Sequence, residues 1–101
     1  AYGLGGGGSN GGNNTSIGYA TMYATTTGAD NNAIGSQSLR LNTTGSQNTT
    51  LGMYTGYSNT TGSRNIFIGY YAGYNQTGSD KFIVDNQYRS SSTNENTYPL
   101  V

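Results

Sequence analysis

Few residues in this chain could carry out chemistry. The chain has four carboxylates and contains no histidine and no cysteine. Two catalytic carboxylates must converge on one point, and no spacing here pairs them. Asp80 and Asp85 flank an apolar stretch at an odd separation, which places them on opposite faces of a strand. We interpret the carboxylates as solvated turn residues and predict that the protein is not an enzyme. They are Asp30, Asp80, Asp85 and Glu95.

Metal and cofactor sites are not indicated either. Hard cations need convergent acids, and softer metals need histidine or cysteine. The spacing Gly3-x-Gly5-x-x-Gly8 matches the glycines of a dinucleotide-binding loop, but that loop requires a preceding strand and a following helix. Neither element is indicated around this glycine-rich run. We predict no catalytic residue, no metal and no cofactor.

Tyrosine is the side chain best suited to contact a ligand, because its ring is apolar and its hydroxyl is polar. Ladders of tyrosine serve packing or contact between chains, and they also suit a sugar ring. Packing is the first interpretation, and a cell-surface glycan is the second. The tyrosines that recur at matching points of the repeat described below are Tyr19, Tyr23, Tyr57, Tyr70 and Tyr74.

Composition excludes several classes of protein. Only 32% of the residues are hydrophobic and 8% are charged, with a net charge of zero. The basic residues are scattered, which indicates no nucleic-acid surface, and no apolar run approaches the roughly 20 residues of a membrane span. Asn, Thr, Ser and Gly favour turns and polar strand faces, so we expect almost no helix. Because the chain opens with Ala1, it is either a processed mature protein or a fragment, and the sequence leaves both open.

An internal repeat is the strongest signal in the sequence. Apolar anchors, each of the first four followed by glycine, recur at spacings of 17, 17, 17 and 16 residues: Ile17, Ile34, Leu51, Ile68 and Val84. Asparagine stands three residues before each of the first four anchors: Asn14, Asn31, Asn48 and Asn65. A turn glycine precedes each anchor by six residues: Gly11, Gly28, Gly45, Gly62 and Gly78. Three columns at one period define a structural unit.

A unit of 17 residues is too short to bury a hydrophobic face alone, so successive units must stack. We predict an all-β fold, a parallel β-solenoid or β-roll of about five 17-residue coils. The anchors are expected to face inward as the core ladder, with a second short strand around Met22, Leu39 and Leu41. The expected divisions are a glycine-rich lead-in over 1–12, solenoid repeats over 13–84, and a C-terminal loop with an edge strand over 85–101.

Residues 14–84, and most clearly 65–74 and 77–86, resemble the Asn-Thr-Ala-Ile-Gly-Tyr repeats of phage tail fibres and bacterial surface proteins. Those proteins often carry a C-terminal endosialidase-type chaperone. The spaced Ile-Gly pairs are more distantly similar to the head repeats of trimeric autotransporter adhesins. The resemblance implies a homotrimer whose three chains share a core, located outside the cell on a virion or cell surface. The unit of 17 residues is longer than the usual adhesin repeat.

Three function classes follow from these observations. The first is a structural segment of a trimeric fibre or adhesin that supports attachment to a host or surface. The second is an extracellular filament whose subunits join by adding strands at uncapped solenoid ends. The third is a solenoid that binds glycan through tyrosine, or ice through its threonine-rich ranks. The expected partner is the chain itself, with a glycan as a further one and neither nucleic acid nor membrane insertion.

Overall fold

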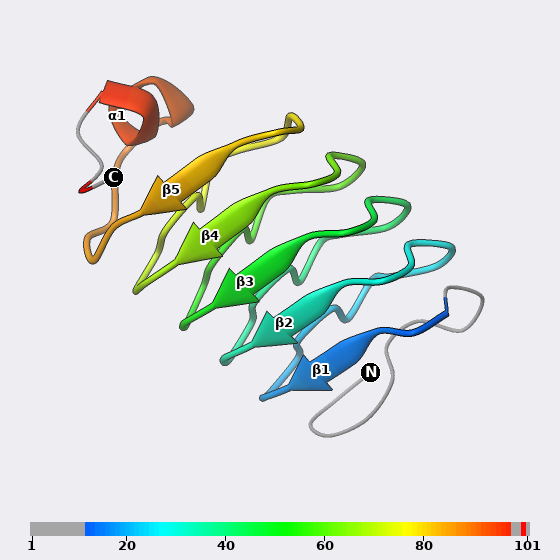
Figure 1. Cartoon of the computed structure of the whole chain (residues 1–101). Helices are drawn as coiled ribbons and strands as arrows, with labels where there is room; N and C mark the ends of the chain where they lie inside the picture. Colours follow the sequence, from blue (N-terminus) through cyan, green and yellow to red (C-terminus); the bar gives the residue numbers. More distant parts are fainter. Residues whose placement is uncertain (1–11, 98–99, 101) are drawn as a thin grey trace.

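The chain is a parallel β-solenoid. The structure is a computed structural model, and it describes residues 12–97 and 100. In this part, each of the stacked coils contributes one strand of three residues to a single sheet (Figure 1). The strands are β1 (Thr15–Ile17), β2 (Asn32–Ile34), β3 (Thr49–Leu51), β4 (Ile66–Ile68) and β5 (Phe82–Val84), and one helix, α1 (Ser92–Thr97), follows them.

The strands are paired in the register that the repeat predicts. All neighbouring pairs are parallel, in the order β1-β2-β3-β4-β5. Each anchor lies opposite the next one, from Ile17 with Ile34 to Ile68 with Val84. Strands β4 and β5 consist entirely of β-branched and aromatic residues, which suit a pleated surface. The predicted stacking of equivalent residues is therefore confirmed.

The predicted inward direction of the anchors is wrong. Side chains alternate along a strand, and here the middle residue of each strand is buried: Ser16, Ala33, Thr50, Phe67 and Ile83. The anchors lie on the other face, where Ile17 is 40% exposed and Leu51 is 48% exposed. The buried asparagines, three residues before the anchors, occupy the opposite face by the same alternation. The column Ile17, Ile34, Leu51, Ile68 and Val84 thus forms an outer ladder rather than a core.

The core inside the coils is filled by residues of complementary size. Small side chains on the first strands, such as Ala33, lie against the large buried side chains of Met22 and Leu39. Farther along the stack, Phe67 projects inward from β4, and the opposite positions are glycines. A Cβ atom on Gly73 would lie 2.6 Å from the Phe67 ring, so the glycine leaves the space that the ring occupies.

The segment opposite the strands is not the second strand that we expected. In residues 20–24 and their equivalents, every second residue has a positive φ, as in Ala20 (55°) and Met22 (51°), or Gln37 (61°) and Leu39 (50°). Such a backbone is incompatible with an extended strand. The segment still bonds to the next coil, since the Met22 N–H donates to the Ser38 carbonyl at 3.0 Å. Inter-coil hydrogen bonds therefore continue around the coil without strand geometry.

The C-terminal end of the stack is covered, although the sequence shows no cap. Helix α1 brings Glu95 into a fully buried position, where its carboxylate accepts from the Asn75 backbone N–H at 2.8 Å and from Gln76 Nε2 at 3.0 Å. The Leu100 N–H donates to the Val84 carbonyl at 2.8 Å, which occupies part of the β5 edge. Of the expected edge strand over 98–101, only residue 100 lies within the described residues. We name residues 85–97 together with Leu100 the C-terminal cap.

A buried ion pair inside the C-terminal cap should give the fold a dependence on acid. Asp85 accepts from Arg89 Nε at 2.8 Å and from its own neighbour, the Asn86 N–H, at 2.8 Å. Burial alone would raise the pKa of Asp85, but the hydrogen bonds and charge of Arg89, together with the backbone N–H groups of Asn86 and Gln87, outweigh it and hold the pKa below the ordinary value of 3.8. Ionised Asp85 therefore stabilises the fold above pH 3.8. This stabilisation is lost as the pH falls through the lower pKa that Asp85 has in the folded chain.

We expect Asp85→Asn to lower the free energy of unfolding near pH 6 and to lose this difference from the unmodified chain in acid. Urea unfolding at pH 6 and at pH 3 measures the difference. Glu95 changes the free energy of unfolding with pH in the opposite direction. Burial raises its pKa above 4.5, so its stabilising contribution is present in acid and is lost as the pH rises through that raised value. A difference for Asp85→Asn that is unchanged between the two pH values would contradict the ion-pair account.

Candidate functional site

The predicted asparagine column forms a continuous ladder inside the solenoid. Asn48 Nδ2 donates to Asn31 Oδ1 at 3.1 Å and to the Gly62 carbonyl at 2.9 Å. Its Oδ1 accepts from the backbone N–H and from Nδ2 of Asn65, both at 3.0 Å. Both donors and both acceptor positions of the amide are then used, which removes the cost of burying it. The members, Asn14, Asn31, Asn48 and Asn65, are all buried, and the ladder ends where Asn65 accepts from the Lys81 N–H.

The glycine column is required by close stacking rather than by turn geometry. Gly28, Gly45 and Gly62 do not have positive φ, but a Cβ atom on Gly45 would lie 2.3 Å from the Gly62 carbonyl oxygen. The glycine carbonyls also receive the donated bonds of the asparagine ladder. Gly78 closes the column with open space beside it, and Gly11 lies outside the described residues.

The glycines after the anchors have a different role. Gly18, Gly35, Gly52 and Gly69 have φ values between 115° and 133°, a region that favours glycine. A Cβ atom on Gly35 would also lie 2.4 Å from the Gly52 carbonyl oxygen. Glycine after the anchor is therefore required both by the backbone conformation and by the close approach of the next coil.

A second polar column was not predicted. Asn59 Nδ2 donates to Asn42 Oδ1 at 3.0 Å, and the two residues are fully buried. The column begins at Thr25 and ends at Gln76, which binds the C-terminal cap. Its signal was present in the sequence, because Thr25, Asn42 and Asn59 lie 17 residues apart and each precedes a Thr-Thr pair.

The structure brings together some of the predicted tyrosines. The rings of Tyr57 and Tyr74 stack with centroids 4.9 Å apart, as the ladder interpretation requires. Beside them, Tyr54 and Tyr71 form a second stack at 4.8 Å, which the sequence analysis missed. Adjacent stacks contact each other, since the Tyr71 and Tyr74 centroids are 5.1 Å apart.

The remaining predicted tyrosines do not stack on one another, although Tyr23 shares the column of Tyr57 and Tyr74, where Arg40 stands between them. Tyr19 and Tyr70 occupy the same point of the repeat, but Ser36 and Met53 separate them, so they form no ladder. Tyr70 contacts Tyr71 edge to face at 4.5 Å. In the first coil, Tyr23 underlies the guanidinium of Arg40, which lies 5.4 Å from its ring centroid.

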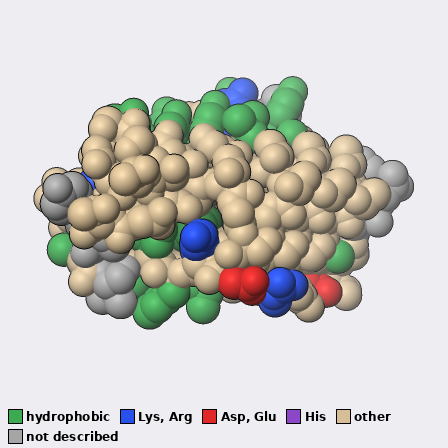
Figure 2. All heavy atoms as spheres, turned by 90° about the horizontal axis from the view of Figure 1, so that it is seen from above, with side chains coloured by type: hydrophobic (Ala, Val, Ile, Leu, Met, Phe, Trp, Pro, Cys, Tyr) green, Lys and Arg blue, Asp and Glu red, His purple; other side chains and the backbone are tan. Residues whose placement is uncertain are grey.

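Hydrophobic side chains gather along two opposite margins of the solenoid in Figure 2, with polar, mostly uncharged atoms between them. One group of exposed apolar side chains comes from the outer face of the sheet. We name it the outer strand face and define it by its exposed members: Ile17, Ile34, Leu51, Ile66 and Phe82.

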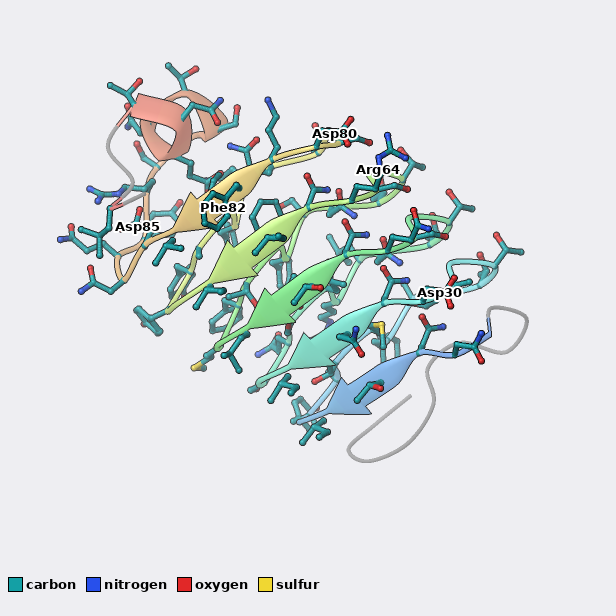
Figure 3. All side chains as sticks on the ribbon, in the orientation of Figure 1. Asp30, Arg64, Asp80, Phe82 and Asp85 are labelled. Carbon is teal, nitrogen blue, oxygen red and sulfur yellow. The ribbon has the colours of Figure 1, made fainter. Side chains whose placement is uncertain are left out.

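Charged groups are few, and two ion pairs are present in the described residues, Arg64 with Asp80 and Arg89 with Asp85. Arg64 lies beside Asp80 on the neighbouring coil, with Arg64 Nε 2.7 Å from Asp80 Oδ1 (Figure 3). The interpretation of the carboxylates as solvated turn residues is wrong for Asp85 and Glu95, which are buried. In the ranges that the structure describes, no group of three acidic, histidine or cysteine residues could hold a metal ion. Gly3, Gly5 and Gly8 lie outside those ranges.

No protein-family model, no curated protein and no solved structure matches this chain. No helix in the described part of the chain is both long and apolar enough to cross a membrane. The arrangement of the described residues therefore has to carry the functional proposal. It offers two surfaces, the outer strand face and the tyrosine stacks, and the same part of the chain has no pocket.

Proposed function

We propose that this chain is a structural repeat segment of an extracellular trimeric fibre, of the phage tail-fibre or surface-adhesin kind. In this role it supports attachment to a host or surface from a virion or cell exterior. The observation that carries the proposal is the outer strand face, because it presents apolar side chains from every strand in two neighbouring columns, Ile17, Ile34 and Leu51 in one and Ile66 and Phe82 in the other.

The outer face of the sheet is largely apolar where a solvent-facing sheet would be polar, and its polar residues are Thr15, Asn32 and Thr49. Ile34 is 39% exposed and Phe82 is 57% exposed. Parallel sheets are almost always covered on both faces, and a contiguous exposed apolar patch marks an interaction site. None of the fifteen residues of β1 to β5 is charged. A second copy of the same uncharged face can cover it without burying a charge.

The number of chains comes from the resemblance to trimeric fibre repeats. The apolar face supports self-association, and three copies around one axis would let each chain bury this face against its neighbours. The filament joined end to end is not proposed, because the C-terminal cap covers one end and the Leu100 N–H already occupies the Val84 carbonyl.

We expect Leu51→Asp to dissociate the trimer while the single chain keeps its fold, because the new charge faces outward on β3. Sedimentation velocity measures the mass, and far-UV circular dichroism checks the fold. The matched control is Thr44→Asp, which places the same charge on an exposed position outside the strands. Ile17→Asp provides a second interface variant if Leu51→Asp fails to fold. Interface variants that sediment like Thr44→Asp would overturn the proposal.

A further inference from the structure

Three successive coils place aromatic and donor side chains on one surface, away from the strand residues. We name it the Tyr-Arg face and define it by Gln37, Arg40, Tyr54, Tyr57, Tyr71 and Tyr74. The two tyrosine stacks, at 4.8 and 4.9 Å, cover the flat faces of their rings. Because all four rings are only partly buried, their edges and hydroxyl groups form the accessible part of the surface.

A chain of hydrogen bonds holds the guanidinium of Arg40 in place. Arg40 Nη1 donates to Gln37 Oε1 at 2.8 Å, and Gln37 Nε2 donates to the Tyr54 hydroxyl at 2.9 Å. The Tyr54 oxygen is used as an acceptor, so its own hydrogen can be donated elsewhere. The Tyr23 ring lies under the same guanidinium. Within the described part of the chain, Arg40 is therefore oriented without a negative partner, and it retains further N–H donors.

The Tyr-Arg face carries an uncompensated positive charge. The ion pairs in the described part of the chain are Arg64 with Asp80 and Arg89 with Asp85, and neither involves Arg40. Burial is the main reason that the pKa values of Tyr71 and Tyr74 are raised, so both phenols remain protonated donors near neutral pH. The surface thus combines apolar rings with an excess of donors.

We propose that the Tyr-Arg face binds a carboxylated sugar of an acidic glycan. An oriented guanidinium suits a carboxylate, which it can bind through two parallel hydrogen bonds. The neighbouring phenols donate to further oxygens of the sugar, and the ring edges pack against its apolar atoms. This inference deepens the attachment role and rests on the proposed function for its biological setting only.

The test uses the full chain and oligogalacturonate, a glycan of uronic acids, with binding measured by titration calorimetry. We expect Arg40→Gln to weaken binding by at least about tenfold, the factor that a charge-assisted hydrogen bond contributes. The matched control is Arg64→Gln, which removes the same charge from the pair with Asp80 and should leave binding unchanged. Arg40→Lys should also weaken binding, because an ammonium cannot form the bidentate contact.

Two further ligands test the chemistry of recognition. The methyl-esterified oligogalacturonate should bind at least about tenfold more weakly, since it lacks the carboxylates. An oligothymidylate of equal charge should bind more weakly than the glycan. The proposal would be overturned if Arg40→Gln and Arg64→Gln lost the same affinity for oligogalacturonate. It would also be overturned if the ester or the oligonucleotide bound as tightly as oligogalacturonate, or if oligogalacturonate did not bind. Sedimentation of the same samples reports the trimer separately, so failure of glycan binding is distinguishable from failure of the fibre proposal.

Discussion

Asn48→Ala is expected to lower the free energy of unfolding by about 3–5 kcal/mol, because four buried polar groups each lose a hydrogen bond. These are Asn31 Oδ1, the Gly62 carbonyl, and the backbone N–H and Nδ2 of Asn65. An unsatisfied buried group costs roughly 1–3 kcal/mol, and water cannot easily replace the lost amide between closely stacked coils. The loss is a large share of the roughly 5–15 kcal/mol that stabilises a typical domain. Urea unfolding followed by circular dichroism measures it.

The control for the ladder is Thr61→Ala. Thr61 is an exposed residue outside the strands, in the coil that follows Asn48, and it takes no part in the ladder. Its substitution should change the free energy of unfolding by no more than about 0.5 kcal/mol. Similar small losses in both variants would show that the ladder does not hold the coils together.

Gly45→Ala is expected to destabilise the solenoid by at least about 3 kcal/mol, because it forces neighbouring coils apart. The new Cβ atom would lie 2.3 Å from both the Gly62 carbonyl oxygen and Asn42 Oδ1. Neither atom can move without breaking hydrogen bonds. Gly62 O accepts from the buried Asn48 and Asn59 amides, and Asn42 Oδ1 accepts from Asn59 Nδ2. Thermal unfolding of the purified variants measures the effect.

The same column supplies its own control. A Cβ atom on Gly78 would meet nothing closer than Lys81 Cε at 3.8 Å, because no further coil stacks there. Gly78→Ala should therefore be neutral or slightly stabilising, by about 0.5 kcal/mol through restriction of the unfolded chain. Equal destabilisation by the two substitutions would indicate that backbone conformation, rather than stacking, requires the glycines.

The period and the stacking could be predicted from the sequence because they are local repetitions. Equivalent residues recur every 17 positions, and the parallel pairing of Asn32 with Thr49 or Ile34 with Leu51 follows that spacing. The direction of the side chains could not be predicted from hydrophobicity alone. Asn31 and Ile34 lie on opposite faces by strand alternation, so one must be outside. The fully bonded asparagine takes the interior, and the isoleucine faces outward.

The C-terminal cap could not be predicted because its contacts are not repeated. The burial of Glu95 depends on Asn75 and Gln76, about one coil earlier in the sequence, and no second copy of the arrangement exists in the described residues to reveal it. The Tyr-Arg face was predicted in part. Tyr57 and Tyr74 were identified, whereas Tyr54 and Tyr71 were missed although their spacing is also 17. Gln37 and Arg40 became candidates only when their hydrogen bonds were seen.

The central claim is that three chains bury their outer strand faces against one another. Multi-angle light scattering of the unmodified chain, in solution and at several concentrations, tests it most directly. One chain has a mass of 10.6 kDa, and we predict a stable species of three times that mass. A mass equal to one chain at every concentration would contradict the account, and so would a species of two chains.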